Sequence, residues 1–252
     1  MISIVCTCNN RTDLDNYLLK GLKNQTENYE LIVIEDSKTD FKSAAQALNH
    51  GGNKASGDYI IFTHQDVLME SATWLNDLEK LVKSIGNLGA AGIAGKSSES
   101  PEVVTNVKHG DNPHFAGKKQ IDTPVKVQTL DECMIVVPKK VFKIRNFDEA
   151  TCDGWHLYGV DYCLMMDEMG LDVYVLPLSI THKSSGDPFA PEYYRILGKL
   201  FRKYKKKYST IHTTVYDWNT RYPVSFERRR FWLTNKIYSG AKNRIKTVLK
   251  IQ

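Results

Sequence analysis

Apolar and polar segments alternate along the first hundred residues and predict strands and helices in turn. Unbroken apolar runs, typical of strands covered on both faces, lie at Ile2–Thr7, Leu31–Ile34, Tyr59–Phe62 and Leu88–Ala94. Between them, apolar residues recur at helical spacing from Leu14 to Leu22, at Phe41–Leu48 and from Trp74 to Ile85. This order favours an α/β fold with three layers, in which helices cover both faces of a mostly parallel sheet.

The pattern changes after about residue 95. Residues 96–128 are polar and irregular, and the segment Asn49–Gly57 likewise predicts a glycine-containing loop. Further elements are expected in the order strand, helix, strand and loop, at Cys133–Val137, Gly159–Met169, Val173–Leu176 and Ile180–Gly186. The helix should end at Gly170. After Pro191 the chain predicts helices separated by linkers rich in Thr and Tyr. We therefore expect a domain at 1–190 and a helical extension at 191–252.

Composition narrows the class of protein. The chain has 252 residues, 42% hydrophobic and 25% charged, which excludes disordered, collagen-like and disulfide-scaffold proteins. No apolar run approaches the ~20 residues that span a bilayer, and the N-terminus predicts a first strand and no signal peptide. Five scattered cysteines favour reduced thiols in a cytoplasmic protein. Residues 191–252 hold 16 Lys and Arg against 3 Asp and Glu, so this extension is strongly basic.

Candidate chemistry gathers where the predicted strands end. In open α/β sheets, ligands bind beyond the carboxyl ends of the strands. The polar residues at those positions are Thr7, Asn9, Arg11, Glu35, Asp36, His64, Gln65, Asp66, His182 and Lys183. Carboxylates brought close together at such an edge repel one another unless a cation is present.

The order of motifs resembles that of the inverting glycosyltransferases with the GT-A fold, of the family 2 type. The stretch YELIVIEDSKTD is similar to the family's second strand with its acidic pair. The stretch around Asn49 and the Gly57–Tyr59 lead into the third strand also fit. That strand ends in His-Gln-Asp-Val at residues 64–67, where the family has Asp-x-Asp. A subgroup with His-Gln-Asp resembles this chain most.

The second half extends the resemblance. LDECMIVVPKKVF, NFDE and VYVLP followed by His182 are similar to the family's acceptor-side elements. GWHLYGVDYCL falls where the family has its acidic catalytic motif, which implies that Asp161 is the general base. The resemblance implies a nucleotide-sugar half at about 1–95 and an acceptor half at about 96–190.

The family's activity implies a role for each candidate residue. Asp66 and His182 are expected to hold Mn²⁺ or Mg²⁺ at the diphosphate. The expected contacts to a UDP-sugar or dTDP-sugar are Thr7, Arg11, Glu35, Asp36, Asn49, His64 and Gln65. The expected acceptor contacts are Asp131, Trp155, His156 and Tyr158. A base that deprotonates the acceptor hydroxyl opposite the leaving group predicts inversion at the anomeric carbon.

Two alternatives share this scaffold. One is a sugar-phosphate nucleotidyltransferase, although CTCNNRTD lacks the glycine-rich loop typical of that class. The other is a non-catalytic module that binds nucleotide sugars or glycans. The basic extension suits an anionic membrane surface near a glycan or lipid-linked acceptor. It could equally pack on the body or on a second copy of the chain, while nucleic acid is not expected because no reading module occurs. We therefore expect a cytoplasmic enzyme, peripheral on the inner membrane face, that builds a surface polysaccharide or glycoconjugate.

Overall fold

The computed structural model describes residues 1–35, 40–110, 112–118, 120–183 and 190–234, and in this part of the chain a seven-stranded sheet forms the centre. Its strands, in spatial order, are β10 (Val125–Lys126), β13 (Asp172–Val175), β5 (Leu88–Gly92), β12 (Met134–Pro138), β3 (Tyr59–His64), β1 (Ile2–Thr7) and β2 (Tyr29–Ile34). Strands β1, β2, β3, β5 and β13 run in one direction, whereas β12 and β10 run antiparallel to their neighbours. The sheet is mixed and largely parallel, as predicted.

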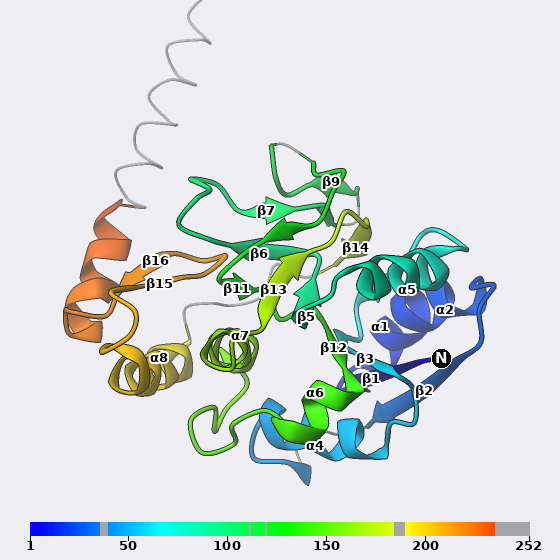
Figure 1. The fold of residues 1–252 in the computed structure, drawn as a ribbon, viewed down its shortest axis with the longest axis horizontal. Coiled ribbons are helices and arrows are strands. Elements are labelled where there is room, and N and C mark those ends of the chain that lie inside the picture. The colour runs from blue at the N-terminus through cyan, green and yellow to red at the C-terminus, as the bar shows by residue number, and fades with distance from the viewer. Residues whose placement is uncertain (36–39, 111, 119, 184–189, 235–252) are drawn as a thin grey trace, which may run out of the picture.

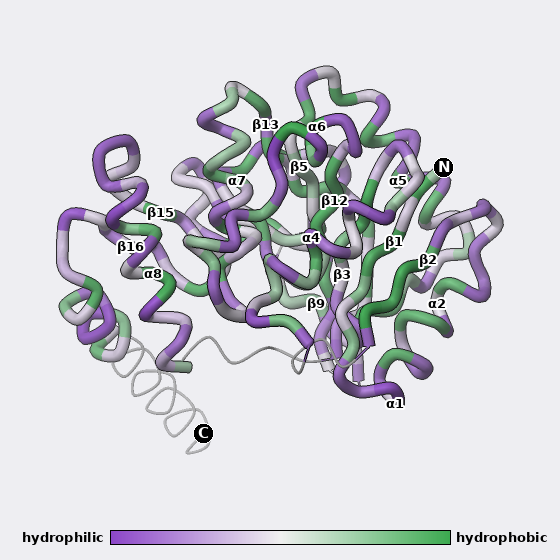
Figure 2. Tube along the Cα trace, turned by 90° about the horizontal axis from the view of Figure 1, so that it is seen from below, coloured by the Kyte–Doolittle hydropathy of each residue, from purple (hydrophilic) through white to green (hydrophobic). Residues whose placement is uncertain are grey.

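Helices cover both faces of this sheet (Figure 1). On one face lie α1 (Arg11–Asp13), a π-helical stretch (Leu14–Leu19), α2 (Lys20–Lys23) and α5 (Trp74–Ser84). On the other lie α4 (Ala44–Lys54), α6 (Lys139–Ile144) and α7 (Tyr158–Glu168). Neighbouring residues of β3 belong to different cores: Ile61 lies in the core that includes Leu78 of α5, and Phe62 lies in the core that includes Leu164 of α7. The strands therefore form the hydrophobic interior of three layers, and most hydrophilic stretches lie at the periphery (Figure 2).

Helix α4 corrects one expectation. The sequence predicts a loop from Asn49 onward, but the helix continues to Lys54. Its two glycines allow close packing, because a Cβ on Gly51 would lie 2.4 Å from Val5 Cγ1 and one on Gly52 would lie 2.5 Å from Phe142 Cζ. The glycines thus let the helix approach its neighbours, and they do not mark a turn.

Two smaller sheets stand at the carboxyl end of the central strands. One contains β11 (Thr129–Leu130), β6 (Ala94–Lys96) and β7 (Val104–Thr105), and the other contains β4 (Val67–Leu68), β14 (Ile180–His182), β8 (Val107–His109) and β9 (His114–Phe115). The predicted loop at Ile180–Gly186 is therefore wrong for its first three residues. They form a strand because β14 pairs with β4 on one side and β8 on the other.

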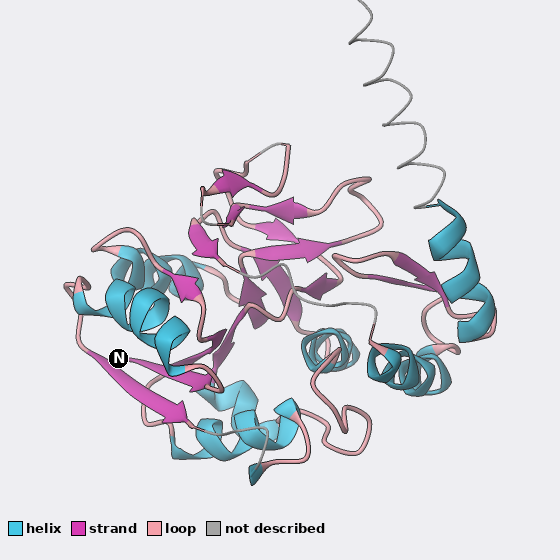
Figure 3. Ribbon diagram, turned by 180° about the vertical axis from the view of Figure 1, so that it is seen from behind, coloured by secondary structure: helices cyan, strands magenta, loops and turns pink. Residues whose placement is uncertain are grey.

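The C-terminal extension packs on the body. It comprises α8 (Pro191–Tyr204), a hairpin of β15 (Thr210–His212) and β16 (Asp217–Asn219), and a helical segment at 224–234 (Figure 3). The Thr- and Tyr-rich segment forms this hairpin where a linker was predicted. Tyr193, Leu200 and Trp218 belong to the same core as α7. The boundary at residue 190 stays a prediction.

Four basic residues of this extension pair with acidic residues of the body. The ion pairs join Arg195 and Lys199 to Asp153, Lys203 to Asp148 and Asp161, and Lys207 to Asp167. Among the described residues, no helix combines the length and hydropathy required to span a bilayer. All five cysteines are buried and free, as small hydrophobic residues are expected to be.

Candidate active site

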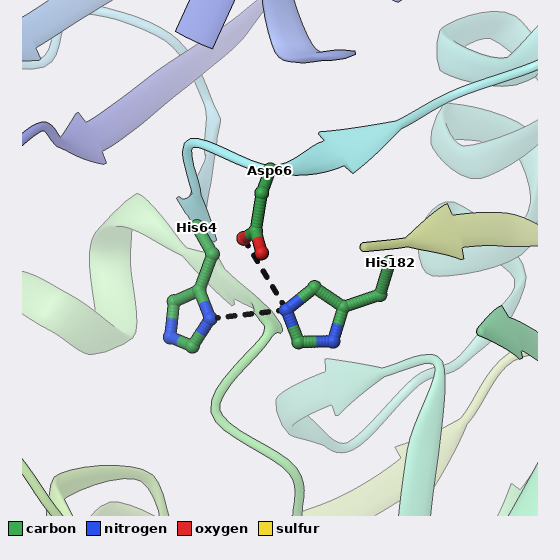
Figure 4. Close-up of side chains that lie close together, drawn as sticks. All are labelled: His64, Asp66 and His182. Atoms are coloured by element: carbon green, nitrogen blue, oxygen red, sulfur yellow. Dashed lines mark hydrogen bonds and ion pairs between the residues drawn. The ribbon is translucent and has the colours of Figure 1, made fainter. Parts of the chain in front are cut away.

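Three side chains meet at the carboxyl end of β3. His64 is the last residue of β3, and Asp66 follows it in the turn that leads into β4. Pairing of β14 with β4 sets His182 opposite Val67, directly beside this turn. His182 Nε2 then lies 3.3 Å from Asp66 Oδ1 and 3.4 Å from His64 Nδ1 (Figure 4). Two segments more than a hundred residues apart thus deliver one compact cluster.

The cluster fits a divalent cation. One ligand atom from each of the three residues lies within 4.8 Å of the others. Two atoms bound at about 2.1 Å to one ion at tetrahedral or octahedral angles lie about 3.0–3.4 Å apart, close to the observed spacing. Two imidazole nitrogens with one carboxylate oxygen form a donor set better suited to Mn²⁺ or another transition metal than to Mg²⁺. His64, expected only as a donor contact, is therefore a candidate ligand.

The surroundings orient these ligands. The backbone N–H of His64 donates to the Cys133 carbonyl. One ring nitrogen of His64, Nε2, lies 3.5 Å from the Tyr158 hydroxyl. The other ring nitrogen, Nδ1, points toward His182. Burial, reinforced by the neighbouring His182, lowers the pKa of His64 to about 4. His64 is therefore neutral at physiological pH, and a neutral imidazole is the form that binds a metal.

A cavity of about 580 Å³ adjoins the cluster, and His64 and His182 belong to its wall. This volume lies in the range of ordinary small-molecule sites. The wall also includes His109, whose ring packs against His182 at 5.6 Å, and two acidic residues, Asp131 and Glu132. Candidate metal ligands, acidic residues and aromatic side chains therefore line one cavity.

The two acidic residues of the cavity differ in their protonation. Burial acts to raise the pKa of Asp131, but bonds from the Cys133 backbone N–H and the Thr214 hydroxyl, with the charge of His182, hold that pKa below its usual value. Burial raises the pKa of Glu132 to about 8, although its Oε1 accepts a 2.9 Å bond from the Gly159 backbone N–H at the start of α7. Asp131 is therefore the ionised carboxylate at neutral pH.

The predicted nucleotide contacts lie at the ends of β1 and β2. Thr7 pairs with both Ile34 and His64, so β1 lies between the other two strand ends. Arg11 Nη1 donates to Glu35 Oε1 at 2.8 Å on an exposed surface. Gln65 accepts from the backbone N–H groups of Asn9 and Asn10 and anchors the start of α1. Asp36 lies outside the described residues.

The structure does not bring Asn49 and Asp161 into the cavity. Asn49 is buried in α4 and hydrogen-bonds to Phe147 and Glu149 in the loop that follows α6. Asp161 is buried in the first turn of α7, where it accepts bonds from Lys203 Nζ at 2.8 Å and from the Tyr204 hydroxyl at 2.8 Å. Neither side chain lines the cavity, so the base role of Asp161 stays a sequence prediction.

The predicted acceptor residues lie near one another. Trp155 and His156 line the cavity with Asp131, whereas Tyr158 stands behind His64 and donates to the Glu132 carbonyl at 3.3 Å. Sequence reasoning missed several further wall residues: His109, Glu132, Tyr193, Thr213, Thr214, Val215 and Phe231. Glu132 was detectable, since it stands beside Asp131 in the LDEC motif. The others come from segments without a recognisable pattern.

Comparison with known proteins now places the chain. It belongs to the family described as "Glycosyltransferase like family", whose model matches residues 4–208. The 1–349 fragment of S. aureus TarS in complex with UDP-GlcNAc has a TM-score of 0.55 to this structure, at 12% identity over 80% of this chain and 66% of that one. GalNAc-T7 with UDP, GalNAc and Mn²⁺ has a TM-score of 0.56, at 12% identity over 81% of this chain and 50% of that one.

A curated relative from Fuscovulum blasticum, "ATP synthase subunits region ORF 6", is 24% identical over 160 residues, or 61% of this chain and 62% of that protein. The chain thus spans less than two thirds of the length of each of these three proteins. The structural matches establish the fold, and the predicted GT-A architecture is confirmed. The His-Gln-Asp subgroup stays a prediction.

Proposed function

We propose that this protein is a metal-dependent inverting glycosyltransferase that moves a sugar from a UDP-sugar or dTDP-sugar to a hydroxyl of a glycan or lipid-linked acceptor. The observation that carries the proposal is the cluster of His64, Asp66 and His182 beside a cavity that also holds an ionised carboxylate. Family membership supports a transferase. The implied biological role is synthesis of a surface polysaccharide or glycoconjugate.

In this proposal the nucleotide-sugar donor binds at the carboxyl ends of the parallel strands. Arg11, held against Glu35 at the end of β2, supplies a positive charge where a nucleotide diphosphate would lie. Thr7 and Gln65 shape the same strand ends. His64, Asp66 and His182 would hold the divalent cation. When bound, such a cation neutralises charge on the departing diphosphate.

For the general base we propose Asp131 in place of Asp161. A base must lie within hydrogen-bond reach of the acceptor hydroxyl and must be ionised. Asp131 lines the cavity and is held ionised, whereas both carboxylate oxygens of Asp161 are bound by Lys203. Glu132 caps the start of α7, and its raised pKa keeps it largely protonated at neutral pH. Attack assisted by Asp131 from the face opposite the diphosphate predicts inversion.

The extension supports a peripheral membrane role. Around the last helical segment, Tyr222, Phe226 and Leu233 are 47%, 50% and 55% exposed beside the basic residues Arg221 and Arg229. Such a surface suits the headgroup zone of an anionic bilayer. Flotation with phosphatidylserine vesicles should fall in a Phe226→Ser/Leu233→Ser variant and not in Ile144→Ser, whose exposed residue lies on the body. Equal flotation would remove the membrane role.

One experiment tests the donor. Thermal shifts are measured with a panel of UDP- and dTDP-sugars, each with and without Mn²⁺. A ligand present at 100 times its dissociation constant stabilises the protein by about 2.7 kcal/mol. We expect one donor to raise the melting temperature only with Mn²⁺, and Asp66→Ala to abolish that rise. No stabilisation by any donor would refute the proposed function.

A second experiment tests the base. Asp131→Asn should lower transfer by a factor of about 10²–10⁴ while metal-dependent donor binding persists. Asp161→Asn, which keeps an acceptor for Tyr204, should retain transfer within about tenfold. The opposite result would restore Asp161 as the base and reject Asp131.

A further inference from the structure

The C-terminal extension forms one wall of the cavity. Three parts of the extension contribute: Tyr193 from α8, residues 213–215 from the tip of the β15–β16 hairpin, and Phe231 from the last helical segment. All of them line the cavity that His64 and His182 also line. The family match ends at residue 208. The hairpin and the last helical segment therefore lie beyond the part of the chain that the family model covers.

This wall is held rigidly. The backbone N–H of His212 donates to Gln128 Oε1 at 2.7 Å, which ties the hairpin to the segment before Asp131. Trp218 is fully buried, donates to the Tyr193 hydroxyl at 3.1 Å and packs against Phe231 at 5.6 Å. A wall built on buried aromatic contacts is preorganised, as a specific binding site requires.

A direct hydrogen bond joins this wall to Asp131, which also lines the cavity. The Thr214 hydroxyl donates to Asp131 Oδ2 at 2.8 Å, while Asp131 Oδ1 accepts from the Cys133 backbone N–H at 3.0 Å. The hairpin tip therefore fixes the rotamer of Asp131. A loop beyond the family match thus holds a carboxylate that lines the same cavity as His64 and His182.

Aromatic side chains form a second part of this end of the cavity. Glu192 of α8 accepts from the Trp155 backbone N–H at 2.9 Å, and the His156 ring packs edge-on against Tyr193 at 5.9 Å. Trp155, His156 and Tyr193 all line the space. Aromatic faces beside threonine hydroxyls match a sugar ring, which carries apolar C–H groups on its faces and hydroxyls around its edge.

We propose that Trp155, Tyr193, residues 213–215 and Phe231 form the acceptor subsite, which takes one carbohydrate ring with a hydroxyl directed at Asp131. Thr214 is a positioning residue that acts through Asp131, and Val215 limits the size of the ring. The inference rests on the proposed function and assigns its acceptor end to the extension. It makes acceptor choice a property of the C-terminal hairpin.

The binding test uses p-nitrophenyl glycosides of glucose, galactose, N-acetylglucosamine and N-acetylgalactosamine as probes. Saturation-transfer NMR is recorded with the full chain, UDP and Mn²⁺. We expect at least one glycoside to bind wild type, and Val215→Trp, which fills the subsite, to weaken that binding at least tenfold. The matched control is Thr123→Trp, on an exposed segment outside the cavity wall. Absence of glycoside binding to wild type, or binding unchanged in Val215→Trp, would overturn the inference.

The positioning role of Thr214 has its own readout. Thr214→Val should lower kcat for transfer about tenfold with little change in acceptor KM, and Thr214→Ser, which keeps the hydroxyl, should restore it. A loss that Thr214→Ser fails to rescue would reject the positioning role. Thermal shifts induced by UDP or dTDP, measured on wild type and the same variants, separate failure of the proposed function from failure of the acceptor subsite. Failure of both UDP and dTDP to stabilise wild type with Mn²⁺ defeats the proposed function. A normal nucleotide-induced shift without an effect of Val215→Trp on glycoside binding defeats only the subsite.

Discussion

Replacement of Lys203 by Met tests what holds α8 against α7. Lys203 Nζ lies 2.8 Å from Asp161 Oδ1, and the Asp161 side chain is 1% exposed while that of Lys203 is 26% exposed. Met keeps most of the aliphatic stem and removes the charge. The variant therefore leaves a buried carboxylate with the Tyr204 hydroxyl as its remaining side-chain donor within the described residues.

The expected loss follows from two opposing terms. Unit charges 2.8 Å apart attract by about 6 kcal/mol at an effective dielectric constant near 20, and desolvation offsets much of this. Removing one partner of a buried pair costs about 3–5 kcal/mol. Because part of Lys203 contacts solvent, we expect the free energy of unfolding to fall by about 2 kcal/mol at pH 7. For a chain of this size that lowers the melting temperature by about 4–8 °C.

The pH dependence makes this prediction specific. Burial raises the pKa of Asp161, and Lys203 opposes that rise. Without Lys203 the folded chain binds a proton at Asp161 more tightly than the unfolded chain does, so the variant loses stability as the pH rises above the unfolded pKa of the carboxyl. Urea unfolding should show a small loss near pH 4 and the full loss at pH 7. Adding Asp161→Asn should recover most of it, whereas Lys206→Met, at an exposed position, should change little. Equal losses at both pH values, or simple additivity in the double variant, would refute the reasoning.

Three further predictions concern the scaffold and the cavity. Gly52→Ala should destabilise the fold by about 1–3 kcal/mol in urea, because its Cβ would meet Phe142 at 2.5 Å, while Gly86→Ala, with nothing within 4 Å, should be neutral or better. Asn49→Ala should cost about 2 kcal/mol in the same assay through its lost buried hydrogen bonds, and a neutral result would show that the bridge is dispensable. The raised pKa of Glu132, about 8, makes the folded chain bind a proton more tightly, so wild-type stability should fall as the pH rises from about 4.5 to 8. Glu132→Gln should remove that fall. Between pH 5 and pH 8 the free energy of unfolding in urea should therefore fall by about 3 kcal/mol more in wild type than in the variant, and parallel pH profiles would contradict the prediction.

Local pattern predicted the strands well and some boundaries badly. The run Ile2–Thr7 forms β1 with the predicted bounds, because an unbroken apolar segment is buried on both faces of a sheet. Gly170 ends α7 with a positive φ of 73°, as its residue type indicates. Gly51 and Gly52 misled the prediction because glycine signals either a turn or a close contact, and only the packing partners distinguish the two.

For the candidate site as well, the sequence predicted some residues, and others became evident only from the tertiary structure. Sequence placed Asp66 and His182 together as ligands through a family resemblance, and the fold brings them within 3.3 Å. It gave His64 a lesser role because a histidine at a strand end carries no information about its distance from His182. It assigned the base role to Asp161 from the order of motifs, and that role stays a prediction. A motif does not record that Lys203 of α8, 42 residues later, pairs with Asp161.

The sequence by itself determined the α/β architecture and the strand ends at which polar residues collect, because both depend on hydrophobic periodicity over a few neighbouring residues. Tertiary structure alone decided which carboxylate lines the cavity, that His64 lies beside Asp66 and His182, and that the turn between β15 and β16 reaches Asp131. Those outcomes depend on strand pairing and helix packing between segments up to 118 residues apart, which no local pattern records.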